Sequence, residues 1–256
     1  MLVRRWNTDA PRPSGALVFV DQEGGEVRAF PALAPASPAA AFESVAAAGA
    51  AGRAAARGLR AAGVDVDLAP VLDLAGGPLG ARHFRRPAFG LAFARGLEQG
   101  GVAGCPKHFP GLGTAPVTTD DAPRVRARVV PRELDAFRAA IRAGARCVMV
   151  SHALYGRFGG RRALTAPAVY ALLRRLGFEG VAVTDSLSVV SGRWPVWWAR
   201  RAARAGADML LFTSARDARR AVRALVPLAR SGALDSSVRR VMRFRRSLGL
   251  AAHPRW

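Results

Sequence analysis

Lysine occurs once in this 256-residue chain, at Lys107, and a histidine follows it at position 108. Every other basic side chain is an arginine. An ammonium group can donate hydrogen bonds to several hydroxyl groups from one point, whereas a guanidinium is a wide planar fork, so the two cations are not interchangeable at a tight site. Lys107 and His108 lie in the glycine- and proline-rich run 104–113, which makes them candidates for binding a ligand. Chance placement of the one lysine is the alternative.

The elements that would position these residues follow a repeating order, in which an Ala-rich helical stretch ends at a glycine and a short apolar run comes next. Helices are expected at 37–63, 131–144, 165–177 and 195–206. Six strands are expected, at 16–20, 64–74, 101–105, 145–150, 180–185 and 207–212. This alternation predicts a parallel α/β fold whose sheet is covered by helices.

Polar side chains stand where the predicted strands end. They are Asp21, Glu23, Asp73, Lys107, His108, Ser151, His152, Asp185, Thr213 and Ser214. In parallel α/β folds, ligands bind at the carboxyl ends of the strands, so these groups are expected to meet on one rim. Capping of the following helices is the alternative, and it suits Asp73, Thr213 and Ser214 better than it suits the lysine and histidines.

Composition restricts the class of protein. Half of the chain is hydrophobic, which is enough for one large domain or two small ones, and a single domain spanning 1–256 is expected. The net charge of +21 is interpreted as a bias toward arginine, and no specific nucleic-acid partner is expected. The two cysteines, Cys105 and Cys147, have neither Cys-x-x-Cys nor metal-type spacing, which argues against a disulfide framework or a zinc site.

Targeting and cofactor motifs are missing from the sequence. Residues 1–13 have no apolar core of signal-peptide length, and no run of about 18 apolar residues occurs. The glycine pairs at 24–25 and 111–113 lack the spacing of dinucleotide or phosphate-binding loops. The sequence therefore predicts a soluble cytoplasmic protein with no cofactor, no metal and no membrane partner.

Five segments, taken in order, resemble glycoside hydrolase family 3. They are VDQEGGEV (20–27), DLAPVLD (67–73), KHFPGLG (107–113), VMVSH (148–152) and LGFEGVAVTDSL (176–187). The similarity extends from about residue 16 to about residue 248 and is nearest to the single-domain bacterial β-N-acetylhexosaminidases. It implies a TIM-type (β/α)8 barrel and a retaining mechanism in which a glycosyl-enzyme forms and is then hydrolysed.

The resemblance also implies roles for individual residues. Asp185 matches the catalytic nucleophile. Lys107 and His108 match residues that bind sugar hydroxyls, Asp21 matches a carboxylate that accepts hydrogen bonds from the same ring, and Arg82 matches a substrate arginine. His152 is expected among the substrate-binding residues as well.

The chain departs from this pattern in the loop that should carry the acid/base histidine. Residues 114–123 contain no histidine, and Ala122 stands where the resemblance would place it. Asp120 or Asp121 could act as the acid/base if burial raised its pKa. Equally, the two acids could be solvated turn residues.

A second departure concerns the barrel. Eight strands are needed and six are found, so the resemblance implies that the first two βα units lie before Ala16. Either the chain is a shortened gene product, or the barrel is open and another chain covers its edge. The leading functional hypothesis is a glycosidase acting on β-linked N-acetylglucosamine or a related sugar from glycans or cell-wall fragments. An inactive sugar-binding relative and a polyanion-binding protein are the alternatives.

Overall fold

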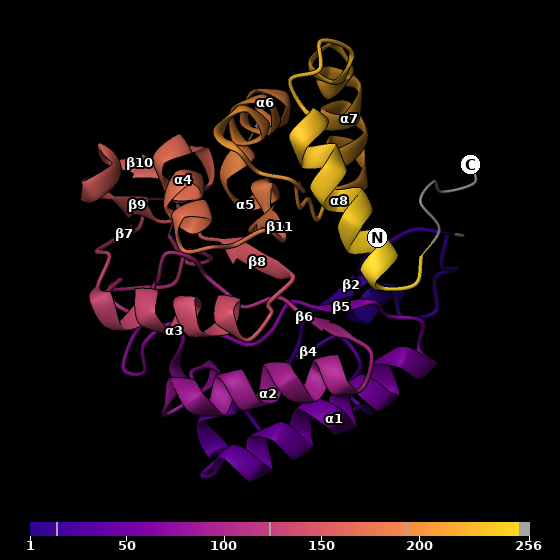
Figure 1. Ribbon diagram of the computed structural model, residues 1–256, viewed down its shortest axis with the longest axis vertical. Coiled ribbons are helices and arrows are strands. Elements are labelled where there is room, and N and C mark those ends of the chain that lie inside the picture. Colours follow the sequence, from indigo (N-terminus) through magenta and orange to yellow (C-terminus); the bar gives the residue numbers. More distant parts are fainter. Residues whose placement is uncertain (14, 123, 193, 251–256) are drawn as a thin grey trace.

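The computed structural model describes residues 1–13, 15–122, 124–192 and 194–250. Short parallel strands occupy the centre and helices surround them, with α1 and α2 side by side on one flank and α6 to α8 on the other (Figure 1). The α-helices are α1 Val45–Ala61, α2 Pro87–Gln99, α3 Pro131–Arg142, α4 Pro167–Arg175, α5 Leu187–Ser191, α6 Pro195–Ala205, α7 Ala215–Arg230 and α8 Asp235–Ser247. Short 3-10 helices lie at Arg5–Asn7, Ala39–Ala41, Gly80–Arg82, Gly156–Phe158 and Ala163–Thr165.

The helix starts follow local sequence signals. Proline occupies the first turn of α2, α3, α4 and α6, where its missing N–H costs nothing. The helix predicted from residue 37 begins instead at Val45, because the Ser44 hydroxyl accepts a hydrogen bond from the Ala47 N–H and caps the helix there.

The central strands pair in a parallel series. A four-stranded sheet has the order β1 (Leu2–Val3), β2 (Phe19–Val20), β5 (Val66–Asp67) and β6 (Ala103–Gly104). β8 (Cys147–Val150) pairs with β11 (Val181–Thr184), with Cys147 opposite Val181. Single bridges from Phe109 to Val150 and from Val183 to Met209 continue the series on either side of this pair. The predicted parallel α/β arrangement is therefore confirmed.

Five further short strands of the described residues lie outside this central series. β3 (Gln22–Gly24) pairs antiparallel with β4 (Val27–Arg28). β9 (Leu154–Tyr155) lies between β7 (Arg126–Ala127), which is parallel to it, and β10 (Arg161–Arg162), which is antiparallel.

The number of central strands differs from the prediction. β1 lies before Ala16 in the sequence and pairs with β2. The given chain therefore contains one strand of the series in the region before Ala16, where the first two βα units were expected. The prediction missed β1 because the strand is only two residues long and arginines follow it. Among the described residues no pairing joins β1 to Met209–Phe212, and a cavity of about 430 Å3 lies between them.

Residues that alternate along the strands form two kinds of core. One set, including Phe19, Val66, Cys105, Met149 and Val183, packs together between the central strands. The other faces outward and packs under the helices, as Val20 does beneath α1 and Val150 beneath α3. No helix among the described residues is both long enough and apolar enough to cross a bilayer.

The sequence argument against disulfide bonding was wrong. A disulfide bond joins Cys105 and Cys147, which are 42 residues apart in sequence and both buried between the central strands. Spacing alone gave no signal for this bond, because the two residues come together only when β6 and β8 lie next to each other.

Candidate active site

A cavity of about 300 Å3 opens where the central strands end, and most of the predicted site residues line it. Its lining includes Asp21, Glu23, Arg82, Lys107, His108, Asp120, Asp185 and Ser186. These side chains come from segments up to 165 residues apart that follow β2, β6 and β11, and from the 3-10 turn Gly80–Arg82. These residues therefore meet at one rim of the fold, as predicted.

Lys107 lies at the base of the cavity in a buried ion network. Its Nζ is 2.8 Å from Asp21 Oδ1 and 2.5 Å from Glu23 Oε1. Arg82 donates through Nε and Nη2 to the two oxygens of the Glu23 carboxylate, both at 2.8 Å. Glu23 therefore links the two cations that were expected to bind substrate. The sequence marked Glu23 only as a strand-end residue, and its bridging role requires the three-dimensional arrangement.

The network fixes the charges of its members. Burial alone would raise the pKa of Glu23, but Lys107 and Arg82 outweigh burial and hold that pKa at about 2. Burial alone would lower the pKa of the Lys107 ammonium, but Asp21 and Glu23 raise it above its ordinary value. Both groups are consequently charged at neutral pH. The cavity floor presents preformed charges and hydrogen-bonding groups to a ligand.

His108 is oriented by Asp73. The Nδ1 of His108 lies 2.7 Å from Asp73 Oδ2, and the same carboxylate accepts hydrogen bonds from the backbone N–H groups of His108 and Leu112. Asp73 is buried and holds this loop, so the suggestion that it caps a helix was wrong. Ser214 does cap α7, because its hydroxyl accepts a hydrogen bond from the Asp217 N–H.

Asp185 and His152 form a second pair beside this loop. The Nδ1 of His152 lies 3.1 Å from Asp185 Oδ2, and the Nε2 is 2.6 Å from the carbonyl oxygen of Ser186. A carbonyl oxygen only accepts, so Nε2 donates to it and Nδ1 faces the carboxylate. His152 is fully buried and does not line the cavity. It contacts Asp185 on the side away from the cavity, so it can orient Asp185 but does not face the cavity itself.

The surroundings of Asp185 favour its ionised form. Burial would raise its pKa, but the nearby His152 and His108, the Ser186 N–H and Lys107 together lower the pKa below its ordinary value. The Ser186 N–H donates to Asp185 Oδ1 at 2.7 Å. A carboxylate that is ionised and oriented at a cavity wall can act as a nucleophile.

The two candidate acid/base residues differ in position. Asp120 lines the cavity, whereas Asp121 does not. Both side chains are exposed, and both backbone N–H groups are bonded to the Thr118 hydroxyl. The burial on which the acid/base role of either residue was made to depend is therefore not present, and the exposure agrees with the alternative of solvated turn residues.

Glu133, at the start of α3, is a buried carboxyl group that the sequence did not single out. Its Oε1 accepts hydrogen bonds from the N–H groups of Gly113 at 2.7 Å and Leu74 at 3.2 Å, which ties the 107–113 loop to the end of the neighbouring strand. Burial raises the pKa of Glu133 to about 7. Gly111 has a φ of +123°, and a Cβ there would overlap the Glu133 carboxyl group, so glycine is required at this position.

Asp67 is a second buried carboxyl group, beneath the ion network. Its Oδ1 accepts a hydrogen bond from the Gln22 N–H at 2.9 Å, and its Oδ2 has no hydrogen-bond partner. Burial raises the pKa of Asp67 from 3.8 to about 8, despite the opposing effect of Lys107. The folded protein consequently holds a proton on Asp67 between about pH 4 and pH 8, where the unfolded chain has lost it.

This proton gives stability a defined pH dependence. Because the folded state binds more protons in that window, the free energy of unfolding falls as pH rises from 4 to 8. Asp67→Asn mimics the protonated acid. We expect the free energy of unfolding of the wild type to fall by roughly 3 kcal/mol more than that of Asp67→Asn between pH 5 and pH 8. Urea unfolding at the two pH values measures this difference, with Asp9→Asn at an exposed position as the control. An equal change in the free energy of unfolding of the wild type and of Asp67→Asn would contradict the raised pKa of Asp67.

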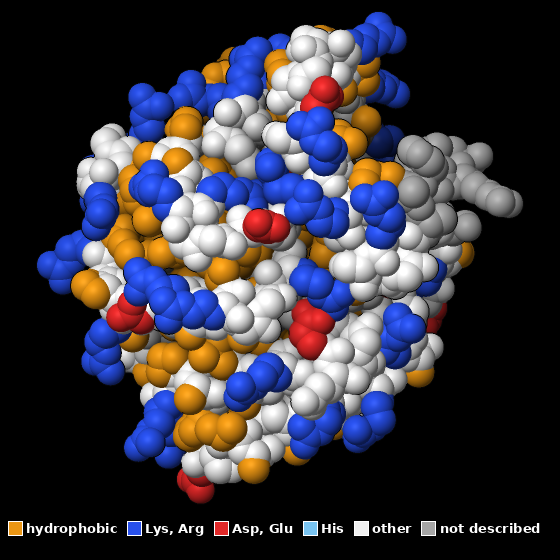
Figure 2. Space-filling view, viewed as in Figure 1, with side chains coloured by type: hydrophobic (Ala, Val, Ile, Leu, Met, Phe, Trp, Pro, Cys, Tyr) orange, Lys and Arg blue, Asp and Glu red, His pale blue; other side chains and the backbone are white. Residues whose placement is uncertain are grey.

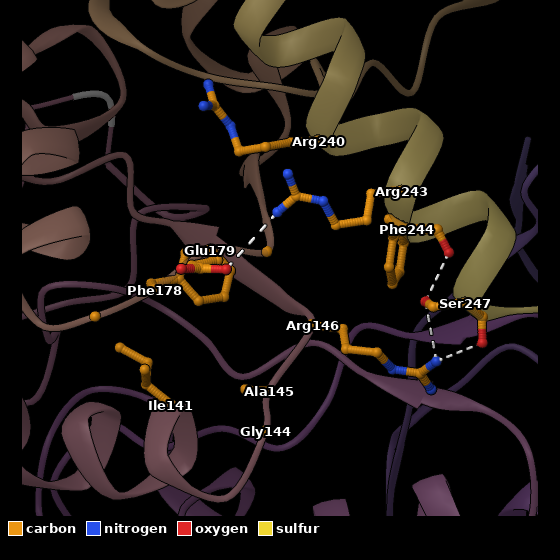
Figure 3. A pocket seen from close by; sticks show the side chains of 12 residues that line it. Ile141, Gly144, Ala145, Arg146, Phe178, Glu179, Arg240, Arg243, Phe244 and Ser247 are labelled. Atoms are coloured by element: carbon orange, nitrogen blue, oxygen red, sulfur yellow. Dashed lines mark hydrogen bonds and ion pairs between the residues drawn. The ribbon is translucent and has the colours of Figure 1, made fainter.

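A different cavity, of about 350 Å3, lies at the opposite ends of β8 and β11, against α8 (Figure 3). Arginines line it, but Arg146 donates to the Ser247 carbonyl oxygen and Arg240 is paired with Asp208, while Arg243 faces Glu179 at 3.7 Å. None of the predicted site residues contributes to it. The described residues also contain no group of three or more His, Cys, Asp or Glu side chains that could hold a metal ion.

Comparison with known proteins places this site in context. The model of the glycosyl hydrolase family 3 N terminal domain matches residues 2–244. A beta-hexosaminidase of Methylococcus capsulatus is 35% identical over 226 residues, which cover 79% of this chain and 68% of that protein. A beta-hexosaminidase of Stenotrophomonas maltophilia is 36% identical over 205 residues, which cover 71% of this chain and 61% of that protein. The chain thus spans about two thirds of the length of these relatives.

Solved structures agree with the family match. The beta-N-acetylhexosaminidase of Beutenbergia cavernae superposes with a TM-score of 0.82 at 31% identity, covering 90% of this chain and 78% of the other. A glycoside hydrolase family 3 beta-N-acetylglucosaminidase of a Paenibacillus species gives 0.81 at 29% identity, covering 94% and 52%. These similarities confirm the expected TIM-type α/β fold, although no closed barrel is seen among the described residues. With its family model matched over nearly its whole length, this chain belongs to glycosyl hydrolase family 3.

Proposed function

We propose that this protein is a retaining glycosidase that releases β-linked N-acetylglucosamine, or a closely related hexosamine, through a glycosyl-enzyme on Asp185. The observation that carries the proposal is the convergence of Asp185, Lys107, Asp21, Arg82 and His108 on one cavity. The names of the similar proteins, beta-hexosaminidase and beta-N-acetylglucosaminidase, support the choice of sugar.

Asp185 performs the first step of the proposed reaction. An oxygen of its carboxylate attacks the anomeric carbon, and the bond from that carbon to the leaving-group oxygen breaks while that oxygen takes up a proton. Water then attacks the same carbon, gives up a proton, and returns the Asp185 carboxylate. The Ser186 N–H fixes the orientation of the carboxylate, and the buried His152 lies beside it, with Nδ1 3.1 Å from Asp185 Oδ2.

The ion network holds the sugar in this proposal. Lys107 still has donor capacity beyond Asp21 and Glu23, because an ammonium carries three N–H bonds. Asp21, about one third exposed, can accept a hydrogen bond from a sugar hydroxyl while it remains paired with Lys107. His108 is held by Asp73 through Nδ1, which leaves the other ring nitrogen for the ligand. Each buried sugar hydroxyl needs such a partner, since an unpaired polar group in a closed site is costly.

Asp120 is proposed as the proton donor, because it lines the cavity and Asp121 does not. Asp120 is exposed. General-acid assistance matters most for a poor leaving group, so the loss of Asp120 should depend strongly on the leaving group. We expect Asp120→Asn to lower kcat/KM for an alkyl N-acetylglucosaminide by about 100-fold, and for its 4-nitrophenyl counterpart by less than about 5-fold. Asp121→Asn is the matched control and should stay within about 2-fold for both substrates. An equal loss in both variants would exclude Asp120.

One observation favours a second function, a sugar-binding protein that does not turn over its ligand. Both acidic residues of the loop are exposed, and Ala122 stands beside them, so neither carboxyl group is a buried proton donor. Such a protein would bind N-acetylglucosamine saturably and leave even activated glycosides intact.

Product stereochemistry separates these possibilities. The purified chain is incubated with 4-nitrophenyl N-acetyl-β-glucosaminide and methanol, and the anomeric proton of the first product is followed by NMR. Formation of the β-methyl glycoside is expected, because attack on a glycosyl-enzyme restores the starting configuration. An α-product would refute the double displacement, and saturable binding with no product would establish the binding protein.

A further inference from the structure

Helix α7 presents an outer face that no other described element of the chain covers. It packs against α6, yet only Ala221 of its 16 residues is fully buried. Val222 is 66% exposed and Val226 is 40% exposed. These two valines are four residues apart, so they lie on the same side of the helix. A pair of branched apolar side chains directed into solvent is a feature that packing within the chain does not explain.

Arginines flank this apolar pair. Arg216, Arg219, Arg223 and Arg230 recur at helical spacing and are all exposed, forming a stripe roughly 20 Å long. A fifth, Arg220, has an acidic partner, Asp217, at 3.9 Å, and among the described residues no ion pair is seen for the other four. The helix carries only that one acidic residue. Figure 2 shows cationic side chains gathered along the upper edge of the molecule, where Figure 1 places α6 and α7.

We propose that this α7 face, Val222 and Val226 with the four flanking arginines, binds the surface of an anionic lipid bilayer. A helix that combines an exposed apolar strip with a cationic flank lies in the plane of a membrane interface, where its apolar side chains enter the boundary of the acyl chains. The arginines are attracted to acidic headgroups, each strengthening binding by about 5-fold near an anionic surface. The sequence did not predict a membrane partner, because it has no apolar run long enough to span a bilayer, and binding to a bilayer surface needs no such run.

The valines favour lipid over nucleic acid as the partner. Phosphate backbones are bound by the charge alone, and single-stranded bases stack on aromatic side chains. Neither interaction uses an exposed pair of aliphatic side chains. A bilayer uses both the apolar strip and the charge.

The position of α7 gives this contact a spatial consequence. Thr213 lines the candidate active site, and Ser214, the next residue, caps the start of α7. A protein lying on a bilayer through α7 would therefore hold the mouth of its site within about one helix length of the surface.

Co-sedimentation of the whole chain with vesicles tests the proposal. Vesicles of equal parts phosphatidylglycerol and phosphatidylcholine should pellet the protein at low salt, and vesicles of phosphatidylcholine alone should not. We expect Arg219→Gln/Arg223→Gln to weaken binding by about 25-fold. Val222→Ser/Val226→Ser, which leaves every charge in place, should weaken it by about 10-fold or more. Circular dichroism verifies that both variants are folded.

A matched pair of arginines elsewhere on the surface provides the control. Arg57 on α1 and Arg95 on α2 are exposed, so Arg57→Gln/Arg95→Gln removes the same charge from the opposite flank and should change binding by less than 2-fold. An equal loss in this control would show that binding follows total charge and would overturn the α7 site. Wild-type affinity of the valine variant, together with complete competition by single-stranded RNA, would assign the arginines to nucleic acid and also overturn it.

Discussion

Replacing Asp185 with alanine is expected to lower kcat for 4-nitrophenyl N-acetyl-β-glucosaminide by about 10,000-fold, which corresponds to about 5 kcal/mol of transition-state stabilisation. The methyl group of alanine cannot form the glycosyl-enzyme, and no other carboxylate in the cavity has the support of His152 and the Ser186 N–H. Initial-rate kinetics on the purified variant measures the loss.

Azide distinguishes a nucleophile from a residue that only shapes the site. In Asp185→Ala the small anion can enter the space left by the carboxylate and attack the anomeric carbon directly. The product should be an α-glycosyl azide, with inverted configuration, and turnover should rise with azide concentration. Asp121→Asn is expected to show neither the loss nor the rescue. Retention of more than a tenth of the wild-type rate in Asp185→Ala would remove Asp185 from the mechanism.

Replacing Lys107 with methionine should produce the second largest effect, on both ligand binding and stability. The change removes the ammonium that lies 2.8 Å from Asp21 and 2.5 Å from Glu23 and leaves the buried Glu23 with Arg82 alone. Breaking a buried ion pair from one side costs about 3 kcal/mol of folding free energy. The loss of a donor to the sugar should in addition weaken binding of N-acetylglucosamine by about 100-fold.

Two measurements separate these effects. Urea unfolding reports the stability change, and calorimetric titration with N-acetylglucosamine in an Asp185→Asn background reports binding without turnover. Lys107→Arg keeps the charge but introduces a planar fork where the pocket holds a compact ammonium, so it should recover part of the stability and little of the binding. Arg57→Met on α1 controls for loss of a surface cation. Wild-type binding by Lys107→Arg would show that charge alone is needed at this position.

The rim of the site was predictable because it follows from strand alternation. Once the apolar runs are placed, the ends of parallel strands must meet, which brings Lys107, Asp21 and Asp185 together whatever the details of the loops. The resemblance to a family then suggested a role for each of them. Arg82 was predictable only through that resemblance, because it lies in a 3-10 turn and not at a strand end.

Other parts of the site depend on contacts that no local pattern encodes. Glu23 joins Lys107 and Arg82 from positions 84 and 59 residues away, and Glu133 holds a loop that lies before it in sequence. Asp73 looked like a helix cap because capping and loop-holding aspartates have the same local sequence. β1 was missed because two apolar residues give too little periodicity to read.

The bond between Cys105 and Cys147 has a consequence for the chain when it is not folded. While the disulfide is intact, the unfolded protein still contains a covalently closed loop between the two cysteines. The loop includes Lys107, His108, both candidate proton donors and all the residues that form α3. The neighbouring strands β6 and β8 then start each refolding attempt already tethered. Closing a loop of this size restricts the unfolded ensemble by about 4 kcal/mol, so reduction of the disulfide should lower the free energy of unfolding by about that amount.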